Sequence, residues 1–329
     1  MSEAIAADVE LERSLRNTTT GCAAAVEGTV PTIDLTSADA AEAIWAAATT
    51  VGFFSVTNHG IDEALIDRCF ASSAGFFARE LTAKKGASPF APQLNSGYEF
   101  MTQVRPSTST ADQKESLQIT ARQGCMDGRW PTEPARLEPD ARLLMDAAHA
   151  LGCRLLNLIE PLACPSICRP ARSRPRTACG AMTASARCGF CTTRRRCRPT
   201  RKTRPSGARA RTRTGAAARC SSSQRPGDEG LEMAANPRAG GDGGWVAVNP
   251  VPGGIAVNIG DMLSRWSAGR LLSNLHRVRM PTAAECQPPR SRFSMAFFMQ
   301  ADKRALISSD REGDEDITAG DYILGRIKS

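Results

Sequence analysis

Three short stretches near the C-terminus decide how this sequence is interpreted: Asn258-Ile259-Gly260-Asp261, His276-Arg277-Val278 and Arg292-Phe293-Ser294. The histidine of the second stretch, His276, is followed sixteen residues later by Arg292-x-Ser294 in the third. Apolar residues flank this Arg-x-Ser motif. An imidazole followed, on a later strand, by an arginine and a hydroxyl group is typical of one half of an active site.

The residues around these stretches alternate between short strands and turns. We expect strands at Trp245–Val248, Ile255–Ile259 and Arg292–Met299, with turn residues at Pro250–Gly254. Short strands at such a spacing are typical of a jelly roll. The apolar residues around Tyr322–Leu324 indicate a closing helix.

The first half of the chain alternates strands with helices. A strand over 30–35 and a helix to about Ala48 are followed by a strand over 52–61 and a second helix. A third, strongly apolar helix is expected from Leu143 to Ile159, closed by Pro161 because proline disrupts a helix interior.

Both ends of the chain resemble one family, the isopenicillin N synthase-like 2-oxoglutarate- and iron(II)-dependent dioxygenases. The resemblance covers about 30–164 and 228–325. It implies a mainly β fold with an N-terminal α/β region, built around a double-stranded β-helix, or jelly roll. The phrases that carry it are Asn58-His59-Gly60, Gly97-Tyr98, Asp112–Glu115, Asn258–Asp261, His276 and Arg292-x-Ser294.

The resemblance assigns three site residues. His276 is the candidate distal ligand of iron(II), with a structural histidine at a strand end as the alternative. Arg292 would bind the distal carboxylate of 2-oxoglutarate, and Ser294, on the same strand face, would add a hydroxyl donor. The alternative for Arg292 is a surface arginine on an edge strand. The neighbouring Phe293 and Met295 favour a buried strand, where an unpaired arginine would be costly.

The family's activity implies the cofactors and partners. They are iron(II), 2-oxoglutarate and O2, with ascorbate as reductant and a small organic substrate that is hydroxylated, desaturated or cyclised. Other candidates are expected to be structural. His59 would close a turn, His149 would lie on a helix, and Asp261 and Trp266 would support the fold.

The net charge of +8 comes from one segment. Residues 165–227 hold sixteen Arg, one Lys, no Asp or Glu, and six of the twelve Cys. The rest of the chain has 25 basic and 34 acidic residues, so it is acidic. The segment has no hydrophobic period of either kind, and we therefore expect it to be disordered, with the central jelly-roll strands disrupted.

The family's His-x-Asp metal pair belongs where this basic segment lies, and the chain lacks it. Neither His59 nor His149 is followed by Asp two places on. If the arginines are encoded by CGN codons, reading 209–216 two bases later allows Gly-Ala-His-Thr-Asp-Trp-Gly, which contains the missing pair. The same offset at 188–195 allows Arg-Phe-Leu-His-Tyr-Pro-Pro. Two matches in the expected order indicate an out-of-frame translation of a GC-rich gene.

Two other interpretations of the segment remain open. An arginine-rich tract can neutralise nucleic-acid phosphates, but the segment has one Phe and no Trp or Tyr for stacking on bases. Cys188-x2-Cys191 with Cys179, Cys197 or Cys220 could bind zinc, but the spacing to a second Cys pair is wrong and no His is near. Asp228 and Glu229 could approach a metal, although their spacing does not single them out.

These patterns divide the chain into four parts: a mobile tail (1–28), an N-terminal dioxygenase region (29–164), the basic segment (165–227) and the C-terminal half of the jelly roll with a closing helix (228–329). No apolar stretch is long enough to cross a membrane, and no secretory signal is recognisable, so the expected location is cytoplasmic with reduced thiols. The expected function is that of an oxidoreductase, inactive as written because the metal pair is missing. The alternative is a non-enzymatic, frame-damaged product or a basic nucleic-acid-binding remnant.

Overall fold

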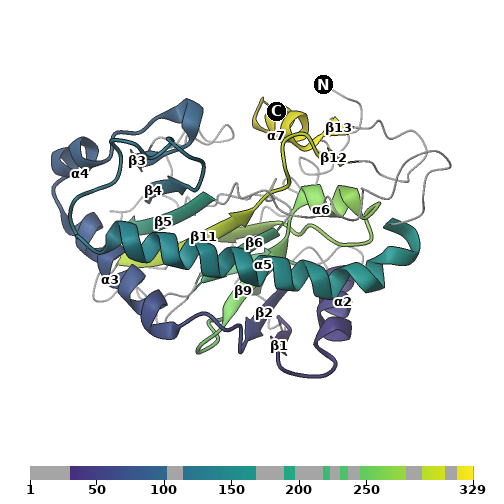
Figure 1. Cartoon of the computed structure of the whole chain (residues 1–329). Coiled ribbons are helices and arrows are strands. Elements are labelled where there is room, and N and C mark those ends of the chain that lie inside the picture. The colour runs from purple at the N-terminus through teal and green to yellow at the C-terminus, as the bar shows by residue number, and fades with distance from the viewer. Residues whose placement is uncertain are drawn as a thin grey trace, which may run out of the picture.

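The computed structural model describes residues 30–101, 114–167, 189–196, 218–222, 230–235, 245–278, 291–307 and 317–328. Within these ranges the fold is a jelly roll of two facing sheets, with a layer of helices on the outer face of the larger sheet (Figure 1). The expected mobile tail, 1–28, lies outside the described residues.

The major sheet has eight strands, and every neighbouring pair is antiparallel except β1 with β2. Its middle strand, β11, lies between β6 and β5, so the C-terminal half of the chain supplies the centre of the sheet. In spatial order the strands are β1 (Thr32–Asp34), β2 (Phe53–Thr57), β9 (Ile255–Ile259), β6 (Ala218–Ser222), β11 (Ser291–Met299), β5 (Gly189–Arg196), β4 (Lys114–Thr120) and β3 (Gly97–Phe100).

The minor sheet has three antiparallel strands, in the order β10 (His276–Val278), β7 (Leu231–Ala234) and β8 (Trp245–Ala247). A short pair, β12 (Leu306–Ile307) with β13 (Ile317–Thr318), follows near the C-terminus. The smaller helical elements are α4 (Leu81–Ala87), η1 (Pro92–Leu94), α6 (Asp261–Trp266) and α7 (Ala319–Lys328).

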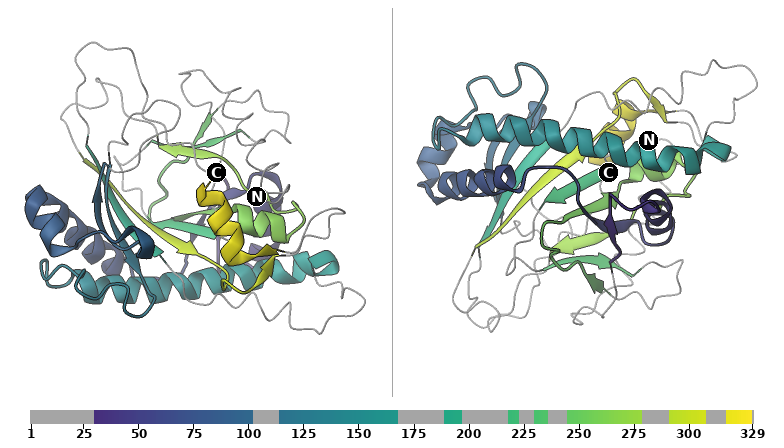
Figure 2. Two further views of the ribbon diagram at one scale, coloured as in Figure 1. Left: turned by 90° about the horizontal axis from the view of Figure 1, so that it is seen from above. Right: turned by 60° about the horizontal axis from the view of Figure 1, so that its bottom comes forward.

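Three helices cover the outer face of the major sheet: α2 (Ala40–Thr50), α3 (Glu63–Ala78) and the long α5 (Leu137–Ile167). Figure 2 shows α5 running along one side of the sheet. Strand side chains alternate between the two faces. In β11, Phe293, Met295 and Phe297 belong to the core that the helices share, so the even-numbered residues of this strand face away from the helices.

A second apolar cluster fills the space between the two sheets. Phe53 of β2 packs there with Leu231 and Met233 of β7 and with Val246 of β8. Its neighbour Phe54 points the other way, into the helix-side core. Phe53 and Phe54 therefore point to opposite faces of the major sheet. The face that carries Phe53 is turned toward the minor sheet, and we call it the barrel face.

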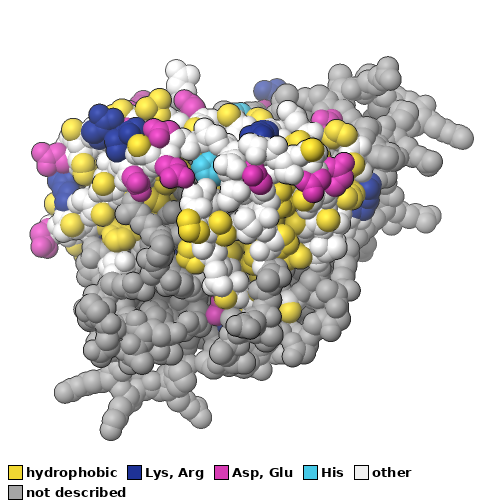
Figure 3. Space-filling model, turned by 90° about the horizontal axis from the view of Figure 1, so that it is seen from below, with side chains coloured by type: hydrophobic (Ala, Val, Ile, Leu, Met, Phe, Trp, Pro, Cys, Tyr) yellow, Lys and Arg dark blue, Asp and Glu magenta, His cyan; other side chains and the backbone are white. Residues whose placement is uncertain are grey.

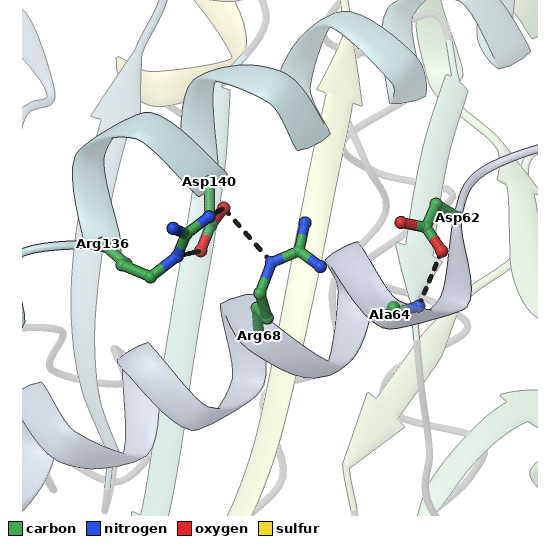
Figure 4. A network of polar contacts seen from close by, with 5 residues as sticks. All are labelled: Asp62, Ala64, Arg68, Arg136 and Asp140. Atoms are coloured by element: carbon green, nitrogen blue, oxygen red, sulfur yellow. Dashed lines mark hydrogen bonds and ion pairs between the residues drawn. The ribbon is translucent and has the colours of Figure 1, made fainter.

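One buried carboxylate fastens two of the covering helices together (Figure 4). The Asp140 side chain of α5 is 1% exposed and accepts hydrogen bonds from Arg136 on its own helix and Arg68 on α3. The hydrogen bonds from Arg136 are the main reason that the pKa of Asp140 lies below its usual range. Burial beside this carboxylate raises the pKa of the Cys69 thiol to about 12. In the same view, Asp62 accepts a hydrogen bond from the backbone N–H of Ala64 and caps α3.

The expectation that the third helix ends at Pro161 is wrong. Helix α5 begins earlier, at Leu137, and continues to Ile167. Proline removes one backbone hydrogen bond from a helix, but it does not prevent the following turn. The preceding turns bury Leu151, Leu155 and Ile159 in the helix-side core, and this packing stabilises the helix through the proline.

The expectation that 165–227 lacks regular structure is wrong for part of that segment. Residues 189–196 form β5, paired with β4 and β11, and 218–222 form β6, paired with β11 and β9. Sheet pairing uses backbone N–H and C=O groups, which any residue except proline supplies, and neither strand contains proline. The rest of the segment beyond Ile167 lies outside the described residues, so its proposed out-of-frame origin stays a prediction.

The other expected elements are confirmed. The early strands and helices occur as β1, α2, β2 and α3, and the late ones as β8, β9, β11 and α7. No described helix is long and apolar enough to cross a membrane. Figure 3 shows acidic side chains spread among hydrophobic ones over the described part of the lower face, in keeping with the acidic balance outside the basic segment.

Candidate functional site

His276 lies on the barrel side of the minor sheet. It begins β10 and pairs with Met233 of β7, which belongs to the cluster between the sheets. Its ring meets Phe53 edge-on, with the ring centroids 6.3 Å apart and the planes at 63°. The residue is 3% exposed. A buried imidazole facing the interior between the sheets is the placement that a ligand requires.

Contacts on either side of His276 fix the strand that carries it. Asn274, two residues before it, donates from Nδ2 to the carbonyl oxygens of Val51, at 3.0 Å, and Ala234, at 2.9 Å. These two bonds join the approach to β10 to the C-terminal end of α2 and to the end of β7. Arg277, directly after His276, forms a buried ion pair with Glu232 on the opposite face of the minor sheet.

Trp245 of β8 contacts Arg277 on the same outer face of the minor sheet. The guanidinium carbon of Arg277 lies 4.0 Å from the centroid of the Trp245 ring, a cation–π geometry. Arg277 and Glu232 are each 2% exposed, and a buried ion pair of this kind holds the register of the two strands. The orientation of His276 is therefore supported by backbone pairing, by Asn274 and by this pair.

Arg292 and Ser294 lie on the barrel face of β11. Phe293 between them contacts Phe77 of α3, with ring centroids 6.3 Å apart, which turns its two neighbours away from the helices. Both residues are half-buried. The alternative of a surface arginine on an edge strand is wrong, because β11 is paired on both sides.

His276 and Arg292 lie on strands of different sheets. Strand β10 belongs to the minor sheet and β11 to the major sheet, so the two residues approach the interior from opposite walls. The chain passes back and forth between the two sheets. Consecutive strands such as β10 and β11 can therefore belong to different sheets. That both residues line one shared cavity stays a prediction.

The described residues do not fit the family's iron centre. They contain no group of three or more His, Cys, Asp or Glu side chains placed to hold a metal ion. The chain's other two histidines are engaged elsewhere. The expected place of the His-x-Asp pair, around 209–216, lies outside the described residues, and its sequence offers arginine, alanine, threonine and glycine only. Among the described residues, therefore, no facial triad of two histidines and a carboxylate is formed.

His59 closes a turn, as expected. Its Nδ1 accepts a hydrogen bond of 3.1 Å from the backbone N–H of Ile61, and Asn58 and Gly60 beside it have φ values of 50° and 82°. Burial lowers the pKa of His59, which favours the neutral imidazole. An interaction with the Gly253 backbone opposes that shift. The residue belongs to the fold and not to the site.

The remaining candidates are structural or lie outside the described residues. His149 is on α5, where its Nε2 lies 3.6 Å from Sγ of Cys153. Asp261 begins α6 and is buried, and Trp266 packs against the helix-side core. Asp228 and Glu229 lie outside the described residues. Of the proposed zinc ligands, Cys191 and Cys220 are placed only by their backbones, in β5 and β6.

A buried ionic network that the sequence did not predict lies at the far end of the major sheet. Nζ of Lys84, on α4, donates to Oε2 of Glu115 at 2.5 Å and to the carbonyl oxygen of Phe77 at 3.0 Å. The Tyr98 hydroxyl donates to the same Oε2 at 2.5 Å. The Gly97-Tyr98 and Lys114-Glu115 motifs lie on strands β3 and β4. Nothing in the sequence linked Lys84 to these two strands.

Two family models match this chain. The model described as non-haem dioxygenase in morphine synthesis N-terminal matches residues 30–140, and the 2OG-Fe(II) oxygenase superfamily model matches residues 201–301. The second match spans β6, β9, β10 and β11, which carry or support the candidate site.

Curated relatives include two proteins whose names refer to 2-oxoglutarate. A 2-oxoglutarate-dependent dioxygenase of Didymella fabae is 28% identical over 325 residues, covering 86% of this chain and 88% of the relative. A 2-oxoglutarate-Fe(II) type oxidoreductase of Aspergillus fumigatus is 28% identical over 264 residues, covering 75% and 72%. Another match, a UPF0676 protein of Schizosaccharomyces pombe, is 36% identical over 88 residues, only 26% of that protein.

Solved structures support the fold. A putative 2OG-Fe(II) oxygenase family protein from Caulobacter crescentus superposes with a TM-score of 0.73 at 21% identity, covering 91% of this chain and 98% of that one. A dioxygenase for auxin oxidation in rice gives 0.67 at 22% identity, covering 91% and 95%. These likenesses establish the jelly-roll architecture.

Proposed function

Because this chain belongs to the 2-oxoglutarate- and iron(II)-dependent oxygenases, we propose that it keeps the family's cofactor-binding wall but lacks a working iron centre. The observation that carries the proposal is the arrangement of β10 and β11. His276 faces the interior from the minor sheet, and Arg292 with Ser294 lies on the barrel face of the major sheet.

Arg292 and Ser294 are suited to hold a carboxylate. A guanidinium group offers paired N–H donors that match the two oxygens of a carboxylate, and the hydroxyl of Ser294, two residues on, adds a third donor. Both side chains are half-buried, where such charge-assisted bonds are less screened by water. We therefore propose these two residues as the anchor for the distal carboxylate of 2-oxoglutarate.

The iron centre is where the proposal departs from the family's activity. With His276 alone, two protein ligands are missing, and the sequence has arginines at 209, 211 and 213, in the stretch where the family's His-x-Asp pair is expected. A complete iron centre, with His276 as one of its ligands, would supply the family's chemistry, in which 2-oxoglutarate and O2 would give succinate and CO2 while a small organic substrate is oxidised. Metal-dependent turnover by the chain as written is not expected, and ascorbate as a reductant would not restore it.

Binding and turnover separate the parts of this proposal. We would titrate the full chain with 2-oxoglutarate and with 2-oxopentanoate, which has the same length but no distal carboxylate. Preference for 2-oxoglutarate is expected in the wild type and is expected to fall about tenfold in Arg292→Gln, because a charge-assisted pair is lost. Equal affinity for the two acids would overturn the anchor assignment.

Succinate release then tests the missing ligands. With iron(II), ascorbate and 2-oxoglutarate, the chain as written should release none. A second version, recoded over 165–227 to the shifted reading frame, should release succinate. Turnover by the chain as written would mean that another carboxylate or thiolate has replaced the lost pair, and the proposal of an inactive centre would then be wrong.

The competing candidate is a non-enzymatic product, either frame-damaged or acting as a basic binder of nucleic acid. The sixteen arginines of the 165–227 segment favour it. The nucleotide sequence across the segment distinguishes the two, because an open shifted frame supports descent from an enzyme. A cytoplasmic location is part of the same proposal, as are the four-part division of the chain and its small organic substrate.

A further inference from the structure

A histidine and a cysteine lie one turn apart on the long covering helix α5. His149 and Cys153 are four residues apart, so their side chains project from the same face of the helix. Nε2 of His149 lies 3.6 Å from Sγ of Cys153. The helix covers the outer face of the major sheet, whereas His276 and Arg292 belong to the barrel side (Figure 2). The pair is therefore a cluster of metal-ligand side chains separate from the candidate site.

The pair lies at the border between the buried stripe of α5 and the surface. Both side chains are half-buried, and Cys153 packs partly against the helix-side core. The neighbouring Gly152 fixes how the helix is turned, because a Cβ there would lie 2.4 Å from Sδ of Met299 on β11. A dissolved ion can therefore reach the imidazole and the thiol, while the packing of the helix holds their backbones in place.

The separation of the two ligand atoms matches a zinc chelate. A tetrahedral zinc ion bound by sulfur at about 2.3 Å and by imidazole nitrogen at about 2.0–2.1 Å holds these two atoms about 3.5 Å apart. The Nε2–Sγ distance of 3.6 Å agrees with this value. Two zinc ligands four residues apart on one helix face are also the arrangement of the His-Glu-x-x-His motif. Rotation of the two side chains would admit an ion without movement of the helix backbone.

The charges on this flank of α5 favour a cation. Helical spacing places Asp146, three residues before His149, and Glu160, seven residues after Cys153, on the same flank. Arg154 is turned away from the pair and donates to a backbone carbonyl group just after β1. A divalent ion at the pair would therefore meet carboxylates on either side along the helix axis.

We propose that His149 and Cys153, in addition to their place in the helix layer, form a zinc-binding site. Thiolate sulfur and imidazole nitrogen are ligands that zinc(II) prefers. The described residues contain no larger group of ligands, so zinc would have two protein ligands here and water in its other positions. On binding, a Zn–S bond replaces the S–H bond of Cys153, and the thiol proton passes to the solvent. The inference does not rest on the proposed function, because no barrel residue takes part.

Cobalt(II) is the spectroscopic probe for this site. A thiolate bound to cobalt(II) gives a sulfur-to-metal charge-transfer absorption, which imidazole and carboxylate ligands do not give. We would titrate the untagged full chain, with its thiols reduced, with cobalt(II) and then with zinc(II). The absorption should appear and then disappear, because zinc(II) binds such ligands more tightly than cobalt(II). A wild-type chain without this absorption would overturn the inference.

Variants then assign the absorption to the pair. Cys153→Ser keeps the shape and removes the thiolate, so the absorption should be lost in proportion to one site. His149→Gln should weaken cobalt binding at least about tenfold, since even the loss of a residue that only supports a ligand costs about 10–100-fold. Cys125→Ser removes a thiol outside α5 and is the control, which should behave as wild type. An undiminished absorption in Cys153→Ser would assign the metal to other cysteines and refute the proposal.

A moved thiol tests the spacing itself. The double variant Cys153→Ser with Asn157→Cys keeps the number of thiols and places one at an exposed position a turn further along α5. This thiol is too far from His149 for both to bind one ion, so tight cobalt binding should not return. Zinc(II) should also raise the melting temperature of the wild type and not that of this variant, because an ion that binds the folded chain stabilises it. Equal zinc-induced shifts in the two proteins would contradict a chelate formed by His149 and Cys153.

Discussion

Replacement of Lys84 by methionine gives the sharpest test of how the far end of the major sheet is held. Lys84 is 1% exposed and Glu115 is 2% exposed, and they bond to each other at 2.5 Å. Methionine fills a similar volume but removes the ammonium that is bonded to the buried Glu115 carboxylate, to which the Tyr98 hydroxyl still donates. Breaking a buried pair by removing one partner costs about 3–5 kcal/mol.

The cost should be visible in thermal and chemical unfolding. For a domain of this size each kcal/mol lowers the melting temperature by about 2–4 °C, so a drop of roughly 6–20 °C is expected. The control is Lys85→Met at the neighbouring exposed position, where the change should stay within about 0.5 kcal/mol. Both are measured by circular dichroism against temperature and by the urea midpoint.

A double variant shows whether the lost charge is the cause. In Lys84→Met with Glu115→Gln, the buried charge is gone and the amide oxygen can still accept from Tyr98. Replacing both charges of a buried pair is often close to neutral, so this variant should regain most of the lost stability. The reasoning would be refuted if Lys84→Met cost no more than Lys85→Met, or if the double variant were no more stable than the single one.

Two further predictions concern the helix layer and one turn. The folded-state pKa of Asp140 lies below its unfolded value of about 3.9, so its contribution is complete above pH 4 and is lost as the pH falls towards the folded value. The stability gap between wild type and Asp140→Asn, followed by urea unfolding, should therefore narrow below about pH 4; a gap that is constant down to pH 2 would contradict this. Gly52 has φ +73°, and a Cβ there would lie 2.1 Å from the carbonyl oxygen of Leu272, so Gly52→Ala should cost at least about 2 kcal/mol. Gly86→Ala, where a Cβ meets nothing within 4 Å, is the control, and equal urea midpoints for the two variants would refute the steric argument.

Local sequence patterns predicted the elements well where the period was clear. The runs at Phe53–Thr57 and Ile255–Ile259 have strand composition and are paired strands, and the Asn58-His59-Gly60 turn has the positive φ values that Asn and Gly accept. The helix end at Pro161 was wrong because the packing of α5 against the sheet outweighs one missing hydrogen bond. Local rules do not contain that tertiary contribution.

The candidate site was predictable in part. His276, Arg292 and Ser294 were identified from residue type and order, and alternation along β11 places the latter two on the barrel face. Which sheet each strand joins was not predictable, because pairing depends on partners far apart in the sequence. The residues that share one face across β3, β4, β5 and β11 are set by the strand register, and no local pattern encodes that register.

The position of β11 has a consequence for the chain in concentrated solution. Both of its hydrogen-bonding neighbours, β5 and β6, come from the basic segment, while β11 itself is a nine-residue run that includes Phe293, Met295, Phe297 and Met299. If either neighbour detaches, an apolar strand with an open edge is exposed to other molecules, and such edges recruit further strands into aggregates. Two strands of the basic segment thus cover both edges of this apolar strand. The yield of soluble protein would therefore depend on whether β5 and β6 stay paired with β11.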